Sequence, residues 1–166
     1  QNDWIKQAYA SGVPMGADLV ATATAGNPKF LVQAIKDPNA GNLDRIQIIK
    51  VSTKNGKSAE KIFDVVWSDD RKKDATGKLP AVGNTVDVKT ATYTNNIGAA
   101  ELIGYWEDTE FDPQSYVTYY ARVIEIPTPR WSTYLAAKHN MDVNKSVDAT
   151  IQERAWTSPV WYVPVK

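Results

Sequence analysis

The sequence contains no cysteine, which excludes disulfide bonds, thiolate zinc sites and a cysteine nucleophile. Its single histidine, His139, excludes a multi-histidine metal site and restricts any serine–histidine–aspartate triad to that residue. The chain also has no excess charge of either sign, because 19 basic residues balance 19 acidic ones. No apolar run is long enough to span a membrane. We therefore expect neither a nucleic-acid partner nor a membrane partner.

Aromatic residues are the compositional feature that stands out, with 6 Trp, 8 Tyr and 3 Phe among 166 residues. They either fill a β-rich core or line a ligand surface, and composition leaves both alternatives open. The length suits a single domain with a sizeable core. The chain starts at Gln1 without a methionine, and we interpret it as a mature or trimmed product.

Short segments rich in β-branched and aromatic residues recur along the chain, separated by turn residues. They predict strands at residues 18–23, 29–36, 43–53, 59–67, 86–93, 99–106, 116–126, 151–156 and 160–163. Segment 99–106 would also suit a helix, but its neighbours favour a strand. Two short helices are predicted at 3–10 and 132–138. The predicted fold class is mostly β, an antiparallel β-sandwich of about seven or eight strands with one or two short helices.

Two of these predictions are specific. Asn55-Gly56 between segments 43–53 and 59–67 is the pair that two-residue type I′ hairpin turns prefer. Segment 116–126 is apolar on both of its alternating faces, which predicts a central strand covered on both sides. Pro127 ends that strand, and Pro129 is expected to keep the chain from resuming a ladder.

Acidic residues gather in predicted loops rather than in a metal-binding pattern. The loops 68–84 and 108–114 are expected to be solvated, and neither has the spacing of a calcium loop. A carboxylate pair for glycoside chemistry could be drawn from strand residues Glu101, Glu125 and Glu153, but nothing in the sequence sets their separation. Ion pairs with arginine are the favoured interpretation of these glutamates. His139 follows a short helix, where its charge suits the helix C-terminus.

Charged residues also recur near the central and the last strands. Arg122, Arg130, Glu153 and Arg154 form either a buried salt-bridge network or a patch that meets another domain or an anionic ligand. The network is the favoured interpretation. The tryptophans near the strands, Trp67, Trp131, Trp156 and Trp161, are expected to pack in the core rather than to form an exposed platform.

The run Ile126-Pro127-Thr128-Pro129-Arg130-Trp131, within residues 121–134, resembles the closing region of a bacterial family of unknown function. Residues 43–50, 83–87, 92–102 and 151–162 also fit that family, so the resemblance spans nearly the whole chain. Family members are several times longer, and their N-terminal region looks like a PHP-type metallohydrolase. The resemblance implies that the metal-binding His and Asp motifs lie in that N-terminal region, and that members are exported to the periplasm.

We therefore interpret residues 1–166 as a single β-rich domain, the C-terminal fragment of a larger protein. The predicted function is that of a non-catalytic domain that packs against the catalytic region of the same protein and shapes the approach to its site. The alternative is an independent carbohydrate- or ligand-binding module that uses exposed Trp and Tyr. We assign no catalytic residue, metal ligand or cofactor to this fragment, and a divalent metal is expected only in the N-terminal region. The candidates for binding or interdomain contact are Arg122, Glu125, Arg130, Trp131, Glu153 and Arg154.

Overall fold

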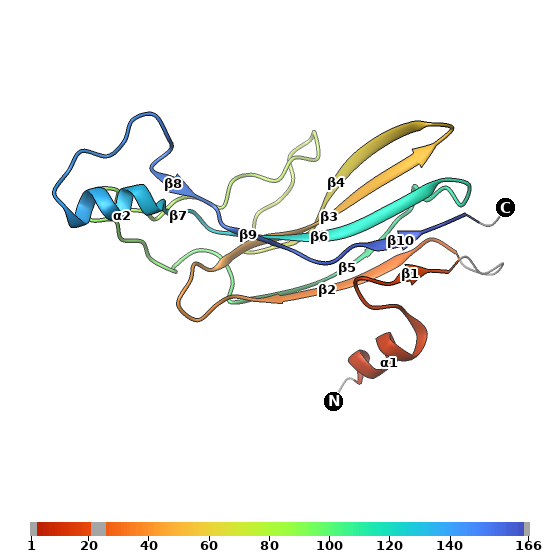
Figure 1. The fold of residues 1–166 in the computed structure, drawn as a ribbon. Coiled ribbons are helices and arrows are strands. Elements are labelled where there is room, and N and C mark those ends of the chain that lie inside the picture. The colour runs from red at the N-terminus through yellow and green to blue at the C-terminus, as the bar shows by residue number, and fades with distance from the viewer. Residues whose placement is uncertain (1–2, 21–25, 165–166) are drawn as a thin grey trace.

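The chain folds mainly into β-strands in a computed structural model that describes residues 3–20 and 26–164 (Figure 1). The largest sheet, called the main sheet below, has six strands. They are β1 (Asp18–Leu19), β10 (Val160–Tyr162), β6 (Tyr116–Glu125), β3 (Leu43–Lys54) and β4 (Lys57–Trp67) in spatial order, with β9 (Arg154–Trp156) also paired to β6. All these pairs are antiparallel except β1 with β10.

Two smaller sheets and two helices complete the fold. The strands β2 (Lys29–Ile35) and β5 (Glu101–Glu107) pair antiparallel and form what we call the small sheet. A third, two-residue pair joins β7 (Thr128–Pro129) to β8 (Thr150–Ile151). The helices α1 (Trp4–Ser11) and α2 (Trp131–Lys138) lie at opposite ends of the molecule (Figure 1). The mostly β fold with two short helices is therefore as the sequence predicts, but the described residues form ten strands rather than seven or eight, and β1 pairs parallel to β10.

The core lies between the small sheet and one face of the main sheet, which we call the inner face. Side chains at alternate positions of β2 point inward and are half-buried, while those between them are exposed. The buried cluster that they cover combines strands β3, β5, β6 and β10, and its members are Leu43, Ile46, Ile48, Leu102, Val117, Tyr119, Ala121 and Tyr162. This alternation confirms the predicted strand at 29–36, and strand β5 confirms the strand interpretation of 99–106.

The predicted hairpin and central strand are both confirmed. Asn55 and Gly56 have φ of 50° and 73°, as a type I′ turn requires, and Lys54 pairs with Lys57 across them. Strand β6 lies inside the main sheet, between β3 on one side and β10 and β9 on the other. Its inner face is buried, but the opposite face carries half-buried Thr118, Tyr120 and Arg122. The predicted cover on both sides is therefore only partial, because the outer face of β6 is half-buried over most of its length, although Ile124 on it is buried.

The predicted strand at 86–93 was wrong, since this segment forms a tight turn. The Asp87 carboxylate accepts hydrogen bonds from the backbone N–H groups of Lys89 and Thr90. Such Asx-type bonds compete with a strand ladder. Ala91 has φ of 51°, which reverses the chain so that Asp87 and Thr92 meet in an isolated bridge.

The proline-rich exit from β6 also differs from the prediction. Thr128 and Pro129 do resume a ladder, with Ile151 and Thr150 as their partners. Pro129 has no N–H to donate, but the next residue compensates, because Arg130 N–H donates to the Ala149 carbonyl at 2.9 Å. The predicted strand 151–156 is divided into β8 and β9 at Gln152, whose side chain donates to the Glu125 carbonyl at 2.8 Å.

Candidate functional site

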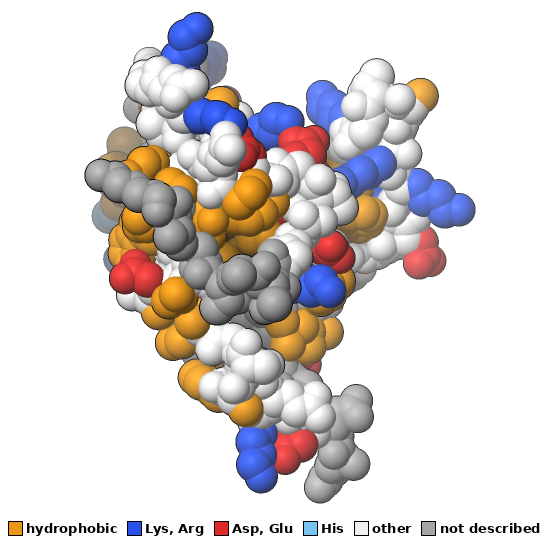
Figure 2. All heavy atoms as spheres, turned by 90° about the vertical axis from the view of Figure 1, so that its right-hand side faces the viewer, with side chains coloured by type: hydrophobic (Ala, Val, Ile, Leu, Met, Phe, Trp, Pro, Cys, Tyr) orange, Lys and Arg blue, Asp and Glu red, His pale blue; other side chains and the backbone are white. Residues whose placement is uncertain are grey.

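A large apolar cleft opens between the small sheet and the main sheet. Its volume is about 1030 Å³. Phe30 and Val32 line one wall, and Ile46, Ile48 and Tyr119 line the floor. Figure 2 shows the end of the molecule at which α1 lies, with hydrophobic side chains gathered above the tip that α1 forms.

The cleft exists because the small sheet covers only part of the main sheet. Strand β5 lies against β3 and β4, and β2 lies against β3. The inner face of β6 is covered at Val117, Tyr119 and Ala121, which are buried. The cover is incomplete beside them, because Leu19 of β1, Val123 of β6 and Val160 of β10 are only half-buried and line the cleft.

Helix α1 and the turn after it border the cleft. The helix begins after Asp3 and ends at Gly12, as predicted, although the Asp3 side chain makes no capping hydrogen bond. Ile5 and Tyr9 are 54% and 72% exposed, and Met15 in the turn is 63% exposed. An eight-residue helix is marginal in water without a packed apolar face. This border is therefore a surface that lacks its packing partner within the described residues.

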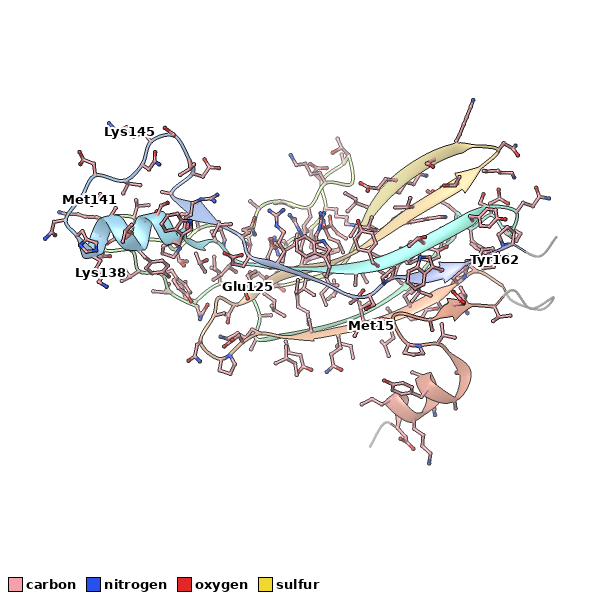
Figure 3. All side chains as sticks on the ribbon, in the orientation of Figure 1. Met15, Glu125, Lys138, Met141, Lys145 and Tyr162 are labelled. Atoms are coloured by element: carbon pink, nitrogen blue, oxygen red, sulfur yellow. The ribbon has the colours of Figure 1, made fainter. Side chains whose placement is uncertain are left out.

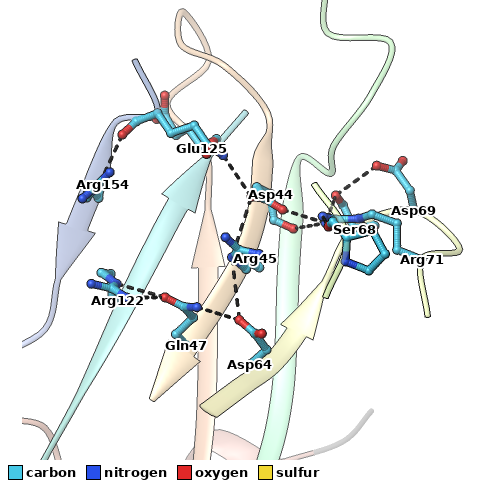
Figure 4. A network of polar contacts seen from close by, with 12 residues as sticks. Asp44, Arg45, Gln47, Asp64, Ser68, Asp69, Arg71, Arg122, Glu125 and Arg154 are labelled. Carbon is cyan, nitrogen blue, oxygen red and sulfur yellow. Dashed lines mark hydrogen bonds and ion pairs between the residues drawn. The ribbon is translucent and has the colours of Figure 1, made fainter. Parts of the chain in front are cut away.

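A polar network occupies the outer face and one end of the main sheet (Figure 4). Its centre is Asp44, which is 1% exposed. The Arg71 guanidinium donates to Asp44 Oδ1 at 2.7 Å and to the Asp44 carbonyl at 2.9 Å. The same guanidinium donates to the carbonyls of Ser68 and Pro80, so it fixes the charged loop to the sheet. The loop is irregular, as predicted, but it is not simply solvated, because the Arg71 side chain is only 11% exposed.

The network continues along the outer face through Gln47. Arg122 donates to Gln47 Oε1 through Nε at 3.0 Å and through Nη2 at 2.6 Å. Gln47 in turn donates to Asp64 Oδ1 at 2.6 Å. Arg45 Nε lies 3.8 Å from Asp44 Oδ2 and 3.7 Å from Asp64 Oδ1. This is an ordered, largely satisfied chain of polar side chains, which is typical of a structural role.

A second buried polar cluster joins Lys50, Asp108 and Tyr119. Lys50 Nζ lies 2.5 Å from Asp108 Oδ2, and the Tyr119 hydroxyl donates to the same oxygen at 2.6 Å. Asp108 is fully buried, so its assignment to a solvated loop was wrong. Burial, together with the hydrogen bond to Asp108, raises the pKa of Tyr119 far above its usual value. The alternation in β3 and β6 offered a sequence signal, because it places Lys50 and Tyr119 on the inner face.

The candidate contact residues are not brought together into one site. Arg122 and Glu125 lie on opposite faces of β6, as predicted, and Arg122 contacts the outer network. Glu125 lies near the middle of the molecule (Figure 3), and burial first and the Glu153 charge second raise the pKa of its carboxyl. Arg130 donates to the Asp148 carbonyl.

The remaining candidates lie on the surface. Trp131, at the start of α2, is 73% exposed. Glu153 and Arg154 are exposed, and Arg154 donates to the Gln152 carbonyl. Within residues 3–20 and 26–164, Arg122, Arg130, Glu153 and Arg154 form no ion pair, so the expected salt-bridge network among them was wrong. Of the tryptophans expected in the core, Trp131, Trp156 and Trp161 are instead exposed.

Within residues 3–20 and 26–164, no group of three or more His, Cys, Asp and Glu side chains is arranged to hold a metal ion. His139 lies at the C-terminal end of α2, as predicted. Neither helix is long and apolar enough to cross a membrane.

A family model described as a protein of unknown function (DUF3604) matches residues 1–164. No curated protein and no solved structure matches the chain.

Proposed function

We propose that this chain, which belongs to the DUF3604 family of proteins of unknown function, is a docking domain. The chain is the C-terminal, non-catalytic β-sandwich domain of a PHP-like metal-dependent hydrolase. It packs against the catalytic region of that protein and shapes the approach to the active site. The resemblance described above also extends the proposal to an exported, periplasmic bacterial protein.

The observation that carries this proposal is the open apolar cleft together with the exposed helix beside it. A soluble domain rarely leaves half-buried core side chains such as Phe30, Val32 and Val123 along a solvent-filled cleft unless a partner covers them. Interfaces between domains of one chain are of this kind, with an apolar centre and a polar border. The cleft and α1 therefore supply the surface that faces the catalytic region.

The divalent metal belongs to the catalytic region in this proposal. The donor set of the described residues does not fit a metal centre, because they contain no cluster of three or more His, Cys, Asp and Glu. The two buried carboxylates, Asp44 and Asp108, are already engaged by Arg71, Gln152 and Lys50. The contribution of this chain is to position and stabilise the neighbouring region.

The test is a binding experiment between this chain and the separately produced catalytic region. Val13, in the turn after α1, lines the cleft and is 41% exposed, whereas Ile62 on β4 is 49% exposed and lies outside it. We expect Val13→Asp to weaken association about tenfold or more, because a carboxylate would be desolvated in the interface. Ile62→Asp is the matched control and should bind like the wild type. Equal affinities of the two variants, or no association of the wild type, would refute the proposal.

A second candidate function, carbohydrate binding, is favoured by one observation on the outer face. Trp156 is the cross-strand neighbour of Arg122, and Trp161 is the neighbour of Thr118. Cross-strand neighbours point to the same side of a sheet, so both tryptophans share this face with Tyr116. All three are exposed, and flat aromatic faces stack on sugar rings. Retention of the wild type on an insoluble polysaccharide, lost in Trp156→Ala/Trp161→Ala but kept in Trp131→Ala, would support this function over docking.

A further inference from the structure

The small sheet has an unpaired edge beside the cleft. Strand β2 pairs with β5 along its whole length, from Lys29 with Glu107 to Ile35 with Glu101. On its other side β2 has no strand partner among the described residues. The free edge is seven residues long, which is a full-length strand rather than a short remnant.

The hydrogen bonds between β2 and β5 show which residues of β2 direct their backbone groups toward the free edge. Lys36 N–H donates to the Ala100 carbonyl, and the Pro28 carbonyl accepts from Asp108 N–H. In an antiparallel pair the N–H and C=O groups of alternate residues point to the same neighbour. Even-numbered residues of β2 therefore bond to β5. Lys29, Leu31, Gln33 and Ile35 direct their backbone groups toward the free edge.

The cleft occupies the place of the next strand in this small sheet. A strand beside β2 would lie about 5 Å from it and would run beneath β6 and β10. Where this added strand would lie, the main sheet lines the cleft with Tyr119, Ala121 and Val123 of β6 and Val160 of β10. All four are apolar or aromatic; Tyr119 and Ala121 are already buried, whereas Val123 and Val160 are half-buried. The inward side chains of an added strand would therefore pack mainly on Val123 and Val160.

We propose that the cleft receives an extended segment of the catalytic region, which pairs with the free edge of β2 as the third strand of the small sheet. The proposal rests on the proposed docking function and specifies its partner as a strand with alternating apolar and polar residues. Backbone N–H and C=O groups at the edge require hydrogen-bond partners once water is displaced. An acyl chain or another purely apolar ligand would fill the cleft but would leave those groups unpaired.

Charge adds a preference for the incoming strand. Lys29 is the one charged side chain among the described residues that line the cleft, and it lies at the beginning of β2. An acidic residue of the partner opposite Lys29 would form a cross-strand pair and set the register. The positions of the incoming strand that face the cleft would be apolar, because the described residues that line the cleft include no other charged side chain.

The test replaces one backbone N–H at the free edge. Gln33→Pro removes an N–H that points away from β5, so the ladder within the small sheet stays intact, as proline requires on an edge strand. Gln33→Thr is the matched control, because both variants lose the side-chain bond from Gln33 to Glu101 but only proline lacks the N–H. We expect Gln33→Pro to weaken binding of the catalytic region about tenfold to a hundredfold and Gln33→Thr to bind like the wild type.

A second test needs no variant. It compares amide hydrogen exchange of the wild-type chain alone with that of its complex with the catalytic region. We expect the amides of Leu31, Gln33 and Ile35 to become protected only in the complex. Wild-type binding by a folded Gln33→Pro chain, or unprotected edge amides in the complex, would overturn strand addition while leaving the docking function standing. Absence of any association would overturn both. Protection of the same amides in a dimer of the isolated chain would show that a second copy is the partner, and would also overturn the proposal.

Discussion

The buried ion pair between Lys50 and Asp108 leads to a sharp stability prediction. Asp108 is 0% exposed and Lys50 is 6% exposed, so both charges have left water. Asp108 also accepts the Tyr119 hydroxyl, and Lys50 also donates to the Glu110 carbonyl at 2.9 Å. Replacing Asp108 by Asn leaves the shape nearly unchanged but leaves a buried ammonium without its counter-charge.

The expected cost of Asp108→Asn is about 3–5 kcal/mol, the range found when one partner of a buried pair is removed. The native stability of a domain is about 5–15 kcal/mol in total, so a third or more of it would be lost. The double variant Lys50→Met/Asp108→Asn should recover part of this loss, because it leaves no uncompensated charge in the interior. The cost therefore comes from the orphaned charge rather than from a net attraction.

The same corner of the molecule provides a matched control. Lys61 pairs with the Glu110 carboxylate, and both side chains are more than half exposed. Lys61→Met should cost less than about 1 kcal/mol, because exposed ion pairs contribute little. Urea denaturation followed by tryptophan fluorescence at pH 7 measures all four proteins. Added salt should reduce the small effect of Lys61→Met and leave that of Asp108→Asn nearly unchanged.

The reasoning would be refuted if Asp108→Asn and Lys61→Met had equal costs. It would also be refuted if the double variant were less stable than Asp108→Asn alone. In either case Lys50 would have to reach water in the native state, which contradicts its burial beside Tyr119.

Three further predictions concern single positions. Because burial and Glu153 raise the pKa of Glu125, the folded state holds that proton to higher pH than the unfolded state, and wild-type stability falls as pH rises through this interval. The melting temperature of Glu125→Gln relative to that of the wild type should therefore rise as the pH is raised above about pH 4, the ordinary range of a glutamate carboxyl, and a constant difference would contradict this. Arg71→Lys should cost about 2–3 kcal/mol in urea denaturation and speed proteolysis of loop 68–80, because an ammonium cannot reach the acceptors at Asp44, Ser68 and Pro80 together. Both Gly98 and Gly56 have positive φ, but a Cβ at Gly98 would lie 2.7 Å from both Asn42 Cβ and Ile126 Cγ2, whereas a Cβ at Gly56 would meet nothing within 4 Å. Gly98→Ala should therefore cost more than about 2 kcal/mol and Gly56→Ala about 1 kcal/mol. Equal costs of the two glycine variants would contradict the crowding at Gly98.

Local sequence signals predicted the parts of the fold that local physics determines. The Asn55-Gly56 pair dictates its own turn, because both residues tolerate positive φ. Alternation in β2 and β6 placed the correct side chains inward, since a strand has a strict period of two. The short helix that starts at Trp131 followed from the residues after Pro129. None of these predictions needed information about distant parts of the chain.

The polar clusters were not predictable because their partners are distant in sequence. Asp108 looks like a loop residue until Lys50, from another strand, is placed beside it. Arg71 belongs to a charged run, and only the fold shows that Asp44 lies within its reach. The segment 86–93 failed for a different reason, since Asp87 favours a local turn over the β propensity of its neighbours. The emphasis on Arg130 and Trp131 followed a distinctive sequence run rather than a physical signal.

The way the fold treats its buried polar groups favours the cleft over the network as the place of contact. Among the described residues only Arg45 Nε and Ser132 Oγ are buried side-chain atoms without a hydrogen bond, and Arg45 still has two carboxylates nearby. The outer network and the Lys50–Asp108 pair thus need nothing from outside. At the edge of β2, in contrast, backbone groups and half-buried apolar side chains lack partners together. A second strand partner would satisfy both requirements at once, which no change within the main sheet can do.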